Sequence, residues 1–159
     1  MSARVHHSAI VVRDVQASLR FWRDGIGFEV MMDMSFDGDW RSLFGARSNR
    51  LRSLFLGDPA HPDAGIVELV QFDETEAEPE STNSHEGAED RAAVTAPREG
   101  FFLLSCFVDV DETLTRLAAL DLGGEARRIT VPAPGGGAVQ MATVVDPDGV
   151  LVELIGLPQ

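Results

Sequence analysis

An internal repeat is the feature that most constrains the fold of this chain. Residues 10–22 align without gaps on residues 105–117, at an offset of 95 positions. Each copy has an apolar run, then an aspartate at Asp14 or Asp109, then apolar residues at helical spacing. An aspartate at this place can cap a helix by accepting hydrogen bonds from free backbone N–H groups. Both copies are therefore predicted to form a strand, a turn and a helix.

Further strands are expected after each predicted helix, which ends at glycines. Apolar and β-branched runs bounded by turn residues predict strands at 28–36, 50–56, 65–72, 125–131, 138–145 and 150–155. Each half then reads βαβββ, and the predicted fold class is α+β with two such modules in tandem. A chain of 159 residues is long enough for one folding unit, so the two modules should share a core.

An acidic stretch separates the two halves. Eight acids and no Lys or Arg lie between Asp73 and Asp90, and no apolar side chain larger than alanine accompanies them. Such a segment cannot bury enough surface to offset its ordering entropy. We expect a first module at 1–72, an acidic, mobile linker at 73–99 and a second module at 100–159.

Charge and composition exclude several classes of partner. Thirteen basic residues, all arginine, against 26 acids give a net charge of −13. Such a field repels nucleic acid and anionic lipid, so neither is an expected partner. No apolar run is long enough to span a membrane, and no signal-peptide core is present at the start. The single cysteine, Cys106, cannot form an internal disulfide and is expected in the core. These features together predict a cytoplasmic protein.

Several stretches carry a resemblance to a known family. They are residues 6–15 (HHSAIVVRDV), 18–22 (SLRFW), 27–30 (GFEV) and 146–154 (DPDGVLVEL). Together they resemble the vicinal oxygen chelate superfamily, which includes glyoxalase I, methylmalonyl-CoA epimerase, extradiol dioxygenases, fosfomycin-resistance enzymes and bleomycin-resistance proteins. The resemblance implies that each module curls into half of a cup. It does not fix a reaction, because one fold carries several chemistries.

The resemblance also implies a metal site, with ligands from the first and last strands of the modules. The implied positions fall on His7, Glu68 and Glu153, and the fourth, counted at the offset of 95, falls on Phe102. A phenylalanine side chain cannot coordinate a metal. Three of the four positions therefore carry residues able to bind one.

The residues themselves point the same way. Alternate side chains of a strand share a face, so His7, Glu68 and Glu153 each lie among apolar residues. A buried carboxylate is costly unless it is paired, protonated or metal-bound. A divalent ion (Zn, Mn, Fe, Co or Ni) would explain all three, while a histidine in a hydrogen bond and glutamates paired with arginines remain the alternative. His6 is expected on the opposite face, without a role.

Three functions follow from these residues and the resemblance. The first is a metal-dependent lyase, isomerase or epimerase that binds a small oxygen-chelating metabolite and forms an enolate-like intermediate, with Glu68 or Glu153 moving a proton. The second is a metal-free binding protein of the bleomycin-resistance type. An extradiol dioxygenase is disfavoured, because its site needs a second histidine.

Two further expectations concern the substrate and the assembly. Phe102, Trp40, Arg50 and Arg52 are candidates for a substrate pocket, since aromatic rings and arginines could contact an organic anion. The alternative for the arginines is an ordinary charged surface. Modules that each expose strand edges and half of an apolar cup also predict a two-fold homodimer with the metal sites near its interface.

Overall fold

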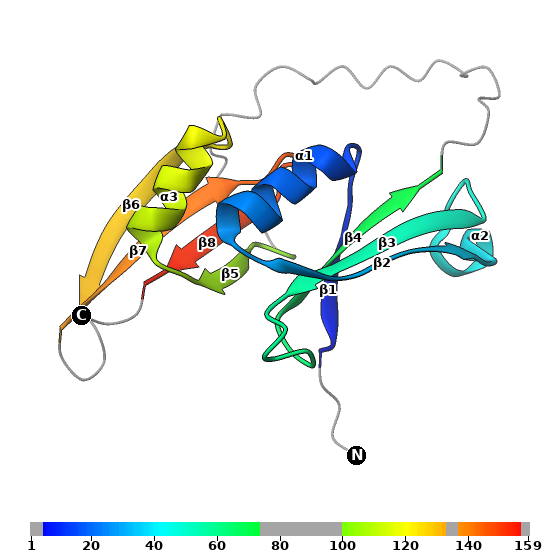
Figure 1. The fold of residues 1–159 in the computed structure, drawn as a ribbon, viewed down its shortest axis with the longest axis horizontal. Helices are drawn as coiled ribbons and strands as arrows, with labels where there is room; N and C mark the ends of the chain where they lie inside the picture. Colours follow the sequence, from blue (N-terminus) through cyan, green and yellow to red (C-terminus); the bar gives the residue numbers. More distant parts are fainter. Residues whose placement is uncertain (1–4, 74–99, 133–136, 157–159) are drawn as a thin grey trace.

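The computed structural model of this chain describes residues 5–73, 100–132 and 137–156 (Figure 1). Within these residues the strands form two four-stranded sheets, one from each half of the chain, in the orders β1-β4-β3-β2 and β5-β8-β7-β6. The strands are β1 (His7–Val11), β2 (Glu29–Asp37), β3 (Arg50–Gly57), β4 (Ile66–Phe72), β5 (Leu104–Phe107), β6 (Gly123–Pro132), β7 (Ala138–Val145) and β8 (Leu151–Ile155). Apart from Asp73, the predicted linker lies outside the described residues.

The two sheets have the same topology, and their element order is the one that the repeat predicted. In each sheet the first strand pairs in parallel with the last strand, and the other neighbours pair antiparallel. The expected α+β fold of two βαβββ modules is therefore confirmed. Every predicted strand is present, and the largest change in bounds is at β6, which begins at Gly123 rather than at position 125.

The helices are α1 (Val15–Leu19), the π-helix η1 (Arg20–Ile26), α2 (Trp40–Phe44) and α3 (Val110–Ala119). As predicted, Asp14 caps α1, its side chain accepting from two backbone N–H groups, and Asp109 caps α3. η1 ends at Gly27, whose φ of 101° is a left-handed conformation that favours glycine. The sequence did not predict α2, because five residues are too few for a periodic apolar pattern.

One hydrophobic core joins the two modules. η1 packs on α3, and Figure 1 shows α1 and α3 next to each other with a sheet on either side. The helices meet at Gly25, where an added Cβ would lie 2.3 Å from Cδ2 of Leu117. Phe21 and Trp22 are fully buried in the same core. Its other buried members come from both halves of the chain and include Ile10, Leu54, Leu69, Val144, Val152 and Leu154.

Polar contacts reinforce this junction. Trp22 Nε1 donates to Asp146 Oδ2 at 3.3 Å, and Ser18 Oγ donates to Asp148 Oδ2 at 3.0 Å. Both aspartates lie in the turn before β8. These hydrogen bonds therefore join this turn of the second module to α1 and η1 of the first module. Asp146 is almost fully buried, and this burial raises the pKa of its carboxyl group. In the described parts of the chain, no helix is long and apolar enough to cross a membrane.

Candidate functional site

Alternation along the strands gives each sheet two different faces. In the first sheet, Ile10 and Leu69 point into the core beside the helices, and we call this side the helix face. Ala9 and Glu68 are opposite one another in the register of β1 and β4, on the other side of the sheet. His7 is two residues before Ala9 and shares that side. We call it the site face, and use the same term for the corresponding face of the second sheet.

His7 and Glu68 meet on the site face. His7 Nε2 lies 3.1 Å from Glu68 Oε2, and the two side chains are 36% and 15% exposed. The other carboxylate oxygen, Oε1, accepts a hydrogen bond of 2.5 Å from Ser53 Oγ on β3. Ser53 is only 2% exposed, so its hydroxyl needs a hydrogen-bond partner inside the protein, and Glu68 provides it. The carboxylate is held between a serine on one side and an imidazole on the other.

The sequence analysis expected His6 on the opposite face, away from this pair, but the structure places it beside His7. Its Nδ1 is 2.9 Å from Nδ1 of His7. The His6 ring also lies against Phe55 of β3, with ring centroids 6.0 Å apart. The expectation that His6 is a neighbour on the opposite face is therefore wrong. Because His6 precedes β1, the alternation of strand side chains does not apply to it.

The second sheet carries its glutamate at the matching position of its last strand. Glu153 of β8 is opposite Ser105 of β5, and Ser105 Oγ donates to Glu153 Oε2 at 2.5 Å. The Glu153 side chain thus has a serine as its partner where Glu68 has both a serine and an imidazole. No group of three His, Cys, Asp or Glu side chains that could hold a metal ion occurs in the described ranges of one chain.

His7 and Glu68 fit a divalent metal as part of a donor set. A neutral imidazole nitrogen and a carboxylate oxygen that approach from separate strands are the ligands that Zn²⁺ and its neighbours in the periodic table accept. Two protein ligands are fewer than the three or four such ions take. In the described residues of one chain Glu153 does not join this pair, so the three predicted ligands are not brought together there.

The register of the sheets corrects the alignment of the two modules. Glu68 is opposite Ala9, and Glu153 is opposite Ser105, so Ser105 corresponds to Ala9 at an offset of 96. The backbone hydrogen bonds at the ends of these strands agree: Val12 N donates to β4, and Val108 N donates to β8 at the equivalent place. The first strands of the modules are therefore related by 96 positions.

The extra position arises in the turn between strand and helix. The helix caps Asp14 and Asp109 keep the offset of 95. Asp14 follows Val12 by two residues, whereas Asp109 follows Val108 directly. The turn of the second module is one residue shorter, and a gap-free alignment through it shifts the preceding strand by one residue.

The counterpart of His7 is consequently Leu103 and not Phe102, as 103 − 7 equals the strand offset of 96. Both residues precede β5, so the register of β5 and β8 assigns them by their count along the chain. The prediction that Phe102 stands in the place of a fourth ligand is therefore wrong. A leucine side chain cannot coordinate a metal either, so three of the four positions still carry residues able to bind one.

Three of the residues suggested for a substrate pocket, Trp40, Arg50 and Arg52, lie in the first module, and Phe102 lies in the second. Arg52 forms an ion pair with Asp33, and Arg50 pairs with Asp37 and Asp73, so both positive charges are already matched within the first sheet. Trp40 stacks on Phe44 within α2, at a centroid distance of 5.6 Å. Phe102, half exposed, precedes β5. Their role in binding a substrate stays a prediction.

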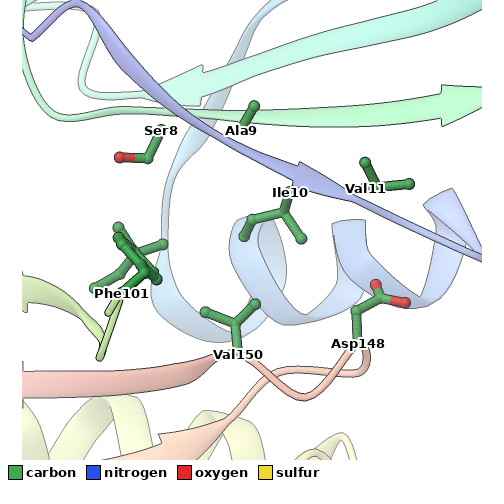
Figure 2. A pocket seen from close by; sticks show the side chains of 8 residues that line it. Ser8, Ala9, Ile10, Val11, Phe101, Asp148 and Val150 are labelled. Carbon is green, nitrogen blue, oxygen red and sulfur yellow. The ribbon is translucent and has the colours of Figure 1, made fainter. Parts of the chain in front are cut away.

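A pocket of about 280 Å³ lies at the junction of the modules, along β1. Figure 2 shows Ser8 and Ile10 on one side of it, with Phe101, Val150 and Asp148 on the other. The Asp148 carboxylate is engaged by Ser18 and Arg13. None of the predicted ligands lines this pocket, so it is separate from the His7–Glu68 pair.

The sequence missed the serines that hold the two glutamates. Ser53 is the one small polar residue in the apolar run 51–56 of β3, and that contrast was a usable signal. Ser105, by comparison, gave no signal, because the alignment at an offset of 95 matched it with Ile10, whereas its structural equivalent in the first module is Ala9. Cys106 was correctly expected in the core, where burial raises the pKa of its thiol to about 11.

The chain has the two βαβββ modules that the sequence resemblance implied. The His7–Glu68 pair lies on the face of the first sheet that points away from the helices. The model of the Glyoxalase/Bleomycin resistance protein/Dioxygenase superfamily matches residues 4–154, and the chain belongs to this superfamily. The lactoylglutathione lyase-like protein terB of Aspergillus terreus is 30% identical over 159 residues, which are 97% of this chain and 75% of that protein. The chain thus has a glyoxalase-like relative over nearly its whole length.

Solved structures agree on the fold. A glyoxalase family protein from Bacillus cereus has a TM-score of 0.64 at 18% identity, over 98% of this chain and 95% of that one. The trypanothione-dependent glyoxalase I of Leishmania major has a TM-score of 0.55 at 22% identity, over 98% of this chain and 87% of that one. At these identities the likeness concerns the fold alone.

Proposed function

We propose that this chain is a metal-dependent, glyoxalase-like lyase or isomerase/epimerase of the cytoplasm. Its substrate would be a small metabolite with adjacent oxygens. The observation that carries the proposal is the 3.1 Å approach of His7 Nε2 to Glu68 Oε2 on the site face. The name of the Aspergillus terreus relative, lactoylglutathione lyase-like, favours lyase chemistry among the possible reactions.

His7, Glu68 and Glu153 would hold the metal, which when bound would supply a Lewis acid toward the substrate oxygens. The chain's own groups would carry the proton. A glutamate carboxylate on an apolar face is a base that can take a proton from carbon next to a carbonyl group and return it. Ser53 and Ser105 each bond one oxygen of such a carboxylate, so they would hold Glu68 and Glu153 in a fixed orientation.

The proposal includes a homodimer, because Glu153 does not reach the pair within one chain. Both site faces expose large apolar side chains. On the first sheet Val11 and Met34 are 65% and 52% exposed, and on the second Phe107 and Ile129 are 77% and 60% exposed. Exposed apolar patches of this kind are typical of surfaces that another chain or a ligand covers. Pairing the first sheet of one copy with the second sheet of another would complete the set of three ligands.

Metal content tests the proposal most directly. The purified, untagged protein should contain about one transition metal ion per chain near neutral pH and lose it on acidification. His7→Ala and Glu68→Gln should abolish binding, whereas His61→Ala should not. His61 is a matched control, since it is an exposed histidine paired with Asp58 in a loop. No metal in the protein, and no thermal shift with Zn²⁺, Mn²⁺, Fe²⁺, Co²⁺ or Ni²⁺, would refute metal-dependent chemistry.

Mixing variants tests whether two chains share the site. In a mixed dimer of Glu68→Gln and Glu153→Gln chains, one of the two sites keeps all its ligands, so metal binding should return. A mixture of His7→Ala and Glu68→Gln chains is the control, because both changes damage the first module and leave no intact site. Light scattering of the unmodified protein should give twice the chain mass of 17.2 kDa. A stable monomer would refute the shared site.

The second candidate is a metal-free binding protein of the bleomycin-resistance type. The observation that favours it is Leu103, which occupies the position corresponding to His7 and leaves the second sheet without an imidazole. The net charge of −13 would attract a cationic ligand to such a protein. Tight binding of a cationic drug by metal-free protein would support this function. The same leucine disfavours an extradiol dioxygenase, which needs two histidines.

A further inference from the structure

The imidazole of His6 is held against that of His7 by two separate contacts. Their Nδ1 atoms are 2.9 Å apart, and the rings meet edge to face with planes at 88°. Both rings also lie against Phe55, with centroid distances of 6.0 Å for His6 and 5.2 Å for His7. Phe55 is opposite Glu68 in the register of β3 and β4. Although His6 precedes β1, its ring is therefore part of the site face.

A hydrogen bond between two Nδ1 atoms requires that one of them carries a hydrogen and the other does not. A neutral imidazole has one such hydrogen. If it is on Nδ1 of His7, that ring donates to His6 and its Nε2 lone pair is free on the side of Glu68. If it is on Nε2, His7 donates to the Glu68 carboxylate, 3.1 Å away, and accepts from His6. The tautomer of one ring thus dictates that of the other.

We propose that His6 is a positioning residue that selects the ring nitrogen of His7 that carries the hydrogen. Its consequence for ligand binding rests on the proposed function, since Nε2 can bind a metal only when the hydrogen is on Nδ1. His6 then accepts that hydrogen. Beside other metal-binding histidines, a carboxylate or a backbone carbonyl accepts the hydrogen bond from the ring nitrogen that does not bind the metal. Without His6, the polar partner that the described residues leave to the His7 ring is the Glu68 carboxylate, and the bond to it favours the Nε2–H tautomer.

Two substitutions separate the hydrogen bond from the ring contact. His6→Phe keeps an aromatic ring that can pack on Phe55 but has no nitrogen. His6→Asn removes the ring, but its amide places a donor and an acceptor near the position of Nδ1. His61→Ala controls for the removal of a histidine elsewhere, and circular dichroism checks that each variant is folded.

The first readout needs no metal. Long-range ¹H–¹⁵N correlation of the ¹⁵N-histidine-labelled full chain, in mildly alkaline buffer, reports the tautomer of His7. We expect His6→Phe to shift His7 toward the Nε2–H tautomer, while His6→Asn and His61→Ala keep the wild-type populations. An unchanged tautomer in His6→Phe would overturn the proposal. So would a shift of equal size in His6→Asn, because packing rather than hydrogen bonding would then be responsible.

The second readout is Zn²⁺ titration of the metal-free chains by calorimetry. Zn²⁺ should bind about tenfold more weakly to His6→Phe, as for other partners of metal-binding histidines, and His6→Asn should recover most of the loss. Equal affinity of His6→Phe and wild type would contradict the proposal. If wild type binds no Zn²⁺, the proposed function fails, and the tautomer measurement alone decides on His6.

Discussion

The contact of η1 with α3 predicts how two substitutions combine. Leu117 is 1% exposed, and Leu117→Ala removes buried atoms and leaves a cavity, so it should destabilise the protein by about 2–5 kcal/mol. Gly25→Ala adds a Cβ that would lie 2.3 Å from Cδ2 and 3.2 Å from Cγ of this leucine. Overpacking costs about 1–3 kcal/mol, while alanine in place of glycine returns about 1 kcal/mol of helix propensity. Gly25→Ala alone should therefore cost about 0–2 kcal/mol.

The double variant should be more stable than the sum of the single changes predicts. With Leu117 shortened, the new methyl group has no clash and fills part of the cavity, so the coupling should be at least about 1 kcal/mol. Urea unfolding, followed by circular dichroism and by the fluorescence of the fully buried Trp22, measures each free energy. Both probes should show one shared transition, since the modules have one core.

A matched pair controls for general weakening of the core. Leu154 is also fully buried, but it is not among the nearest atoms to the Cβ of a residue at position 25. Gly25→Ala and Leu154→Ala should therefore add within about 0.5 kcal/mol. Additivity of Gly25→Ala with Leu117→Ala to the same accuracy would show that η1 and α3 do not pack as described.

Three further predictions follow. The buried Cys106 thiol, with its pKa raised to about 11, should react with a disulfide reagent near pH 8 only as fast as the protein opens, and fast labelling would contradict its burial. The folded-state pKa of Asp146 is raised above 3.8, so the folded state binds this proton more tightly than the unfolded chain does. The unfolding free energy of wild type relative to Asp146→Asn should fall as the pH rises from 3.8 through the raised pKa, and a flat difference would count against this. Replacing residues 74–89 by a short Gly/Ser bridge should change stability by less than about 1 kcal/mol, because their composition has no large apolar side chain to bury.

The sequence was sufficient for the fold because its signals are local and occur twice. The cap residues Asp14 and Asp109, and the apolar stripe that includes Trp22, fix helices after the first strands. Strands follow from β-branched runs between turns. The one-residue difference between the two turns has no local signal of this kind. It becomes visible only through the partners of β1 and β5 in their sheets.

The candidate site was predicted in part for the same reason. The resemblance implied ligands from the first and last strands, and His7 and Glu68 come together because these strands, β1 and β4, are parallel neighbours. Ser53 and His6 could not be assigned in this way. The position of Ser53 beside Glu68 depends on the register of β3, and the position of His6 depends on a ring contact outside any strand.

The corrected register leads to a last prediction about the missing ligand. If the second sheet is to regain the imidazole that the first sheet has, the substitution must be made at Leu103, whose place relative to Glu153 matches that of His7 relative to Glu68. Leu103→His should tighten metal binding by adding a fourth ligand. Phe102→His, one residue earlier and out of register with Glu153, is the matched control and should leave the affinity unchanged. Calorimetric titration of the two variants with Zn²⁺ compares them directly. Tighter binding by Phe102→His than by Leu103→His would show that the strands are related by 95 positions after all, and that the turn after β5 does not differ from the turn after β1.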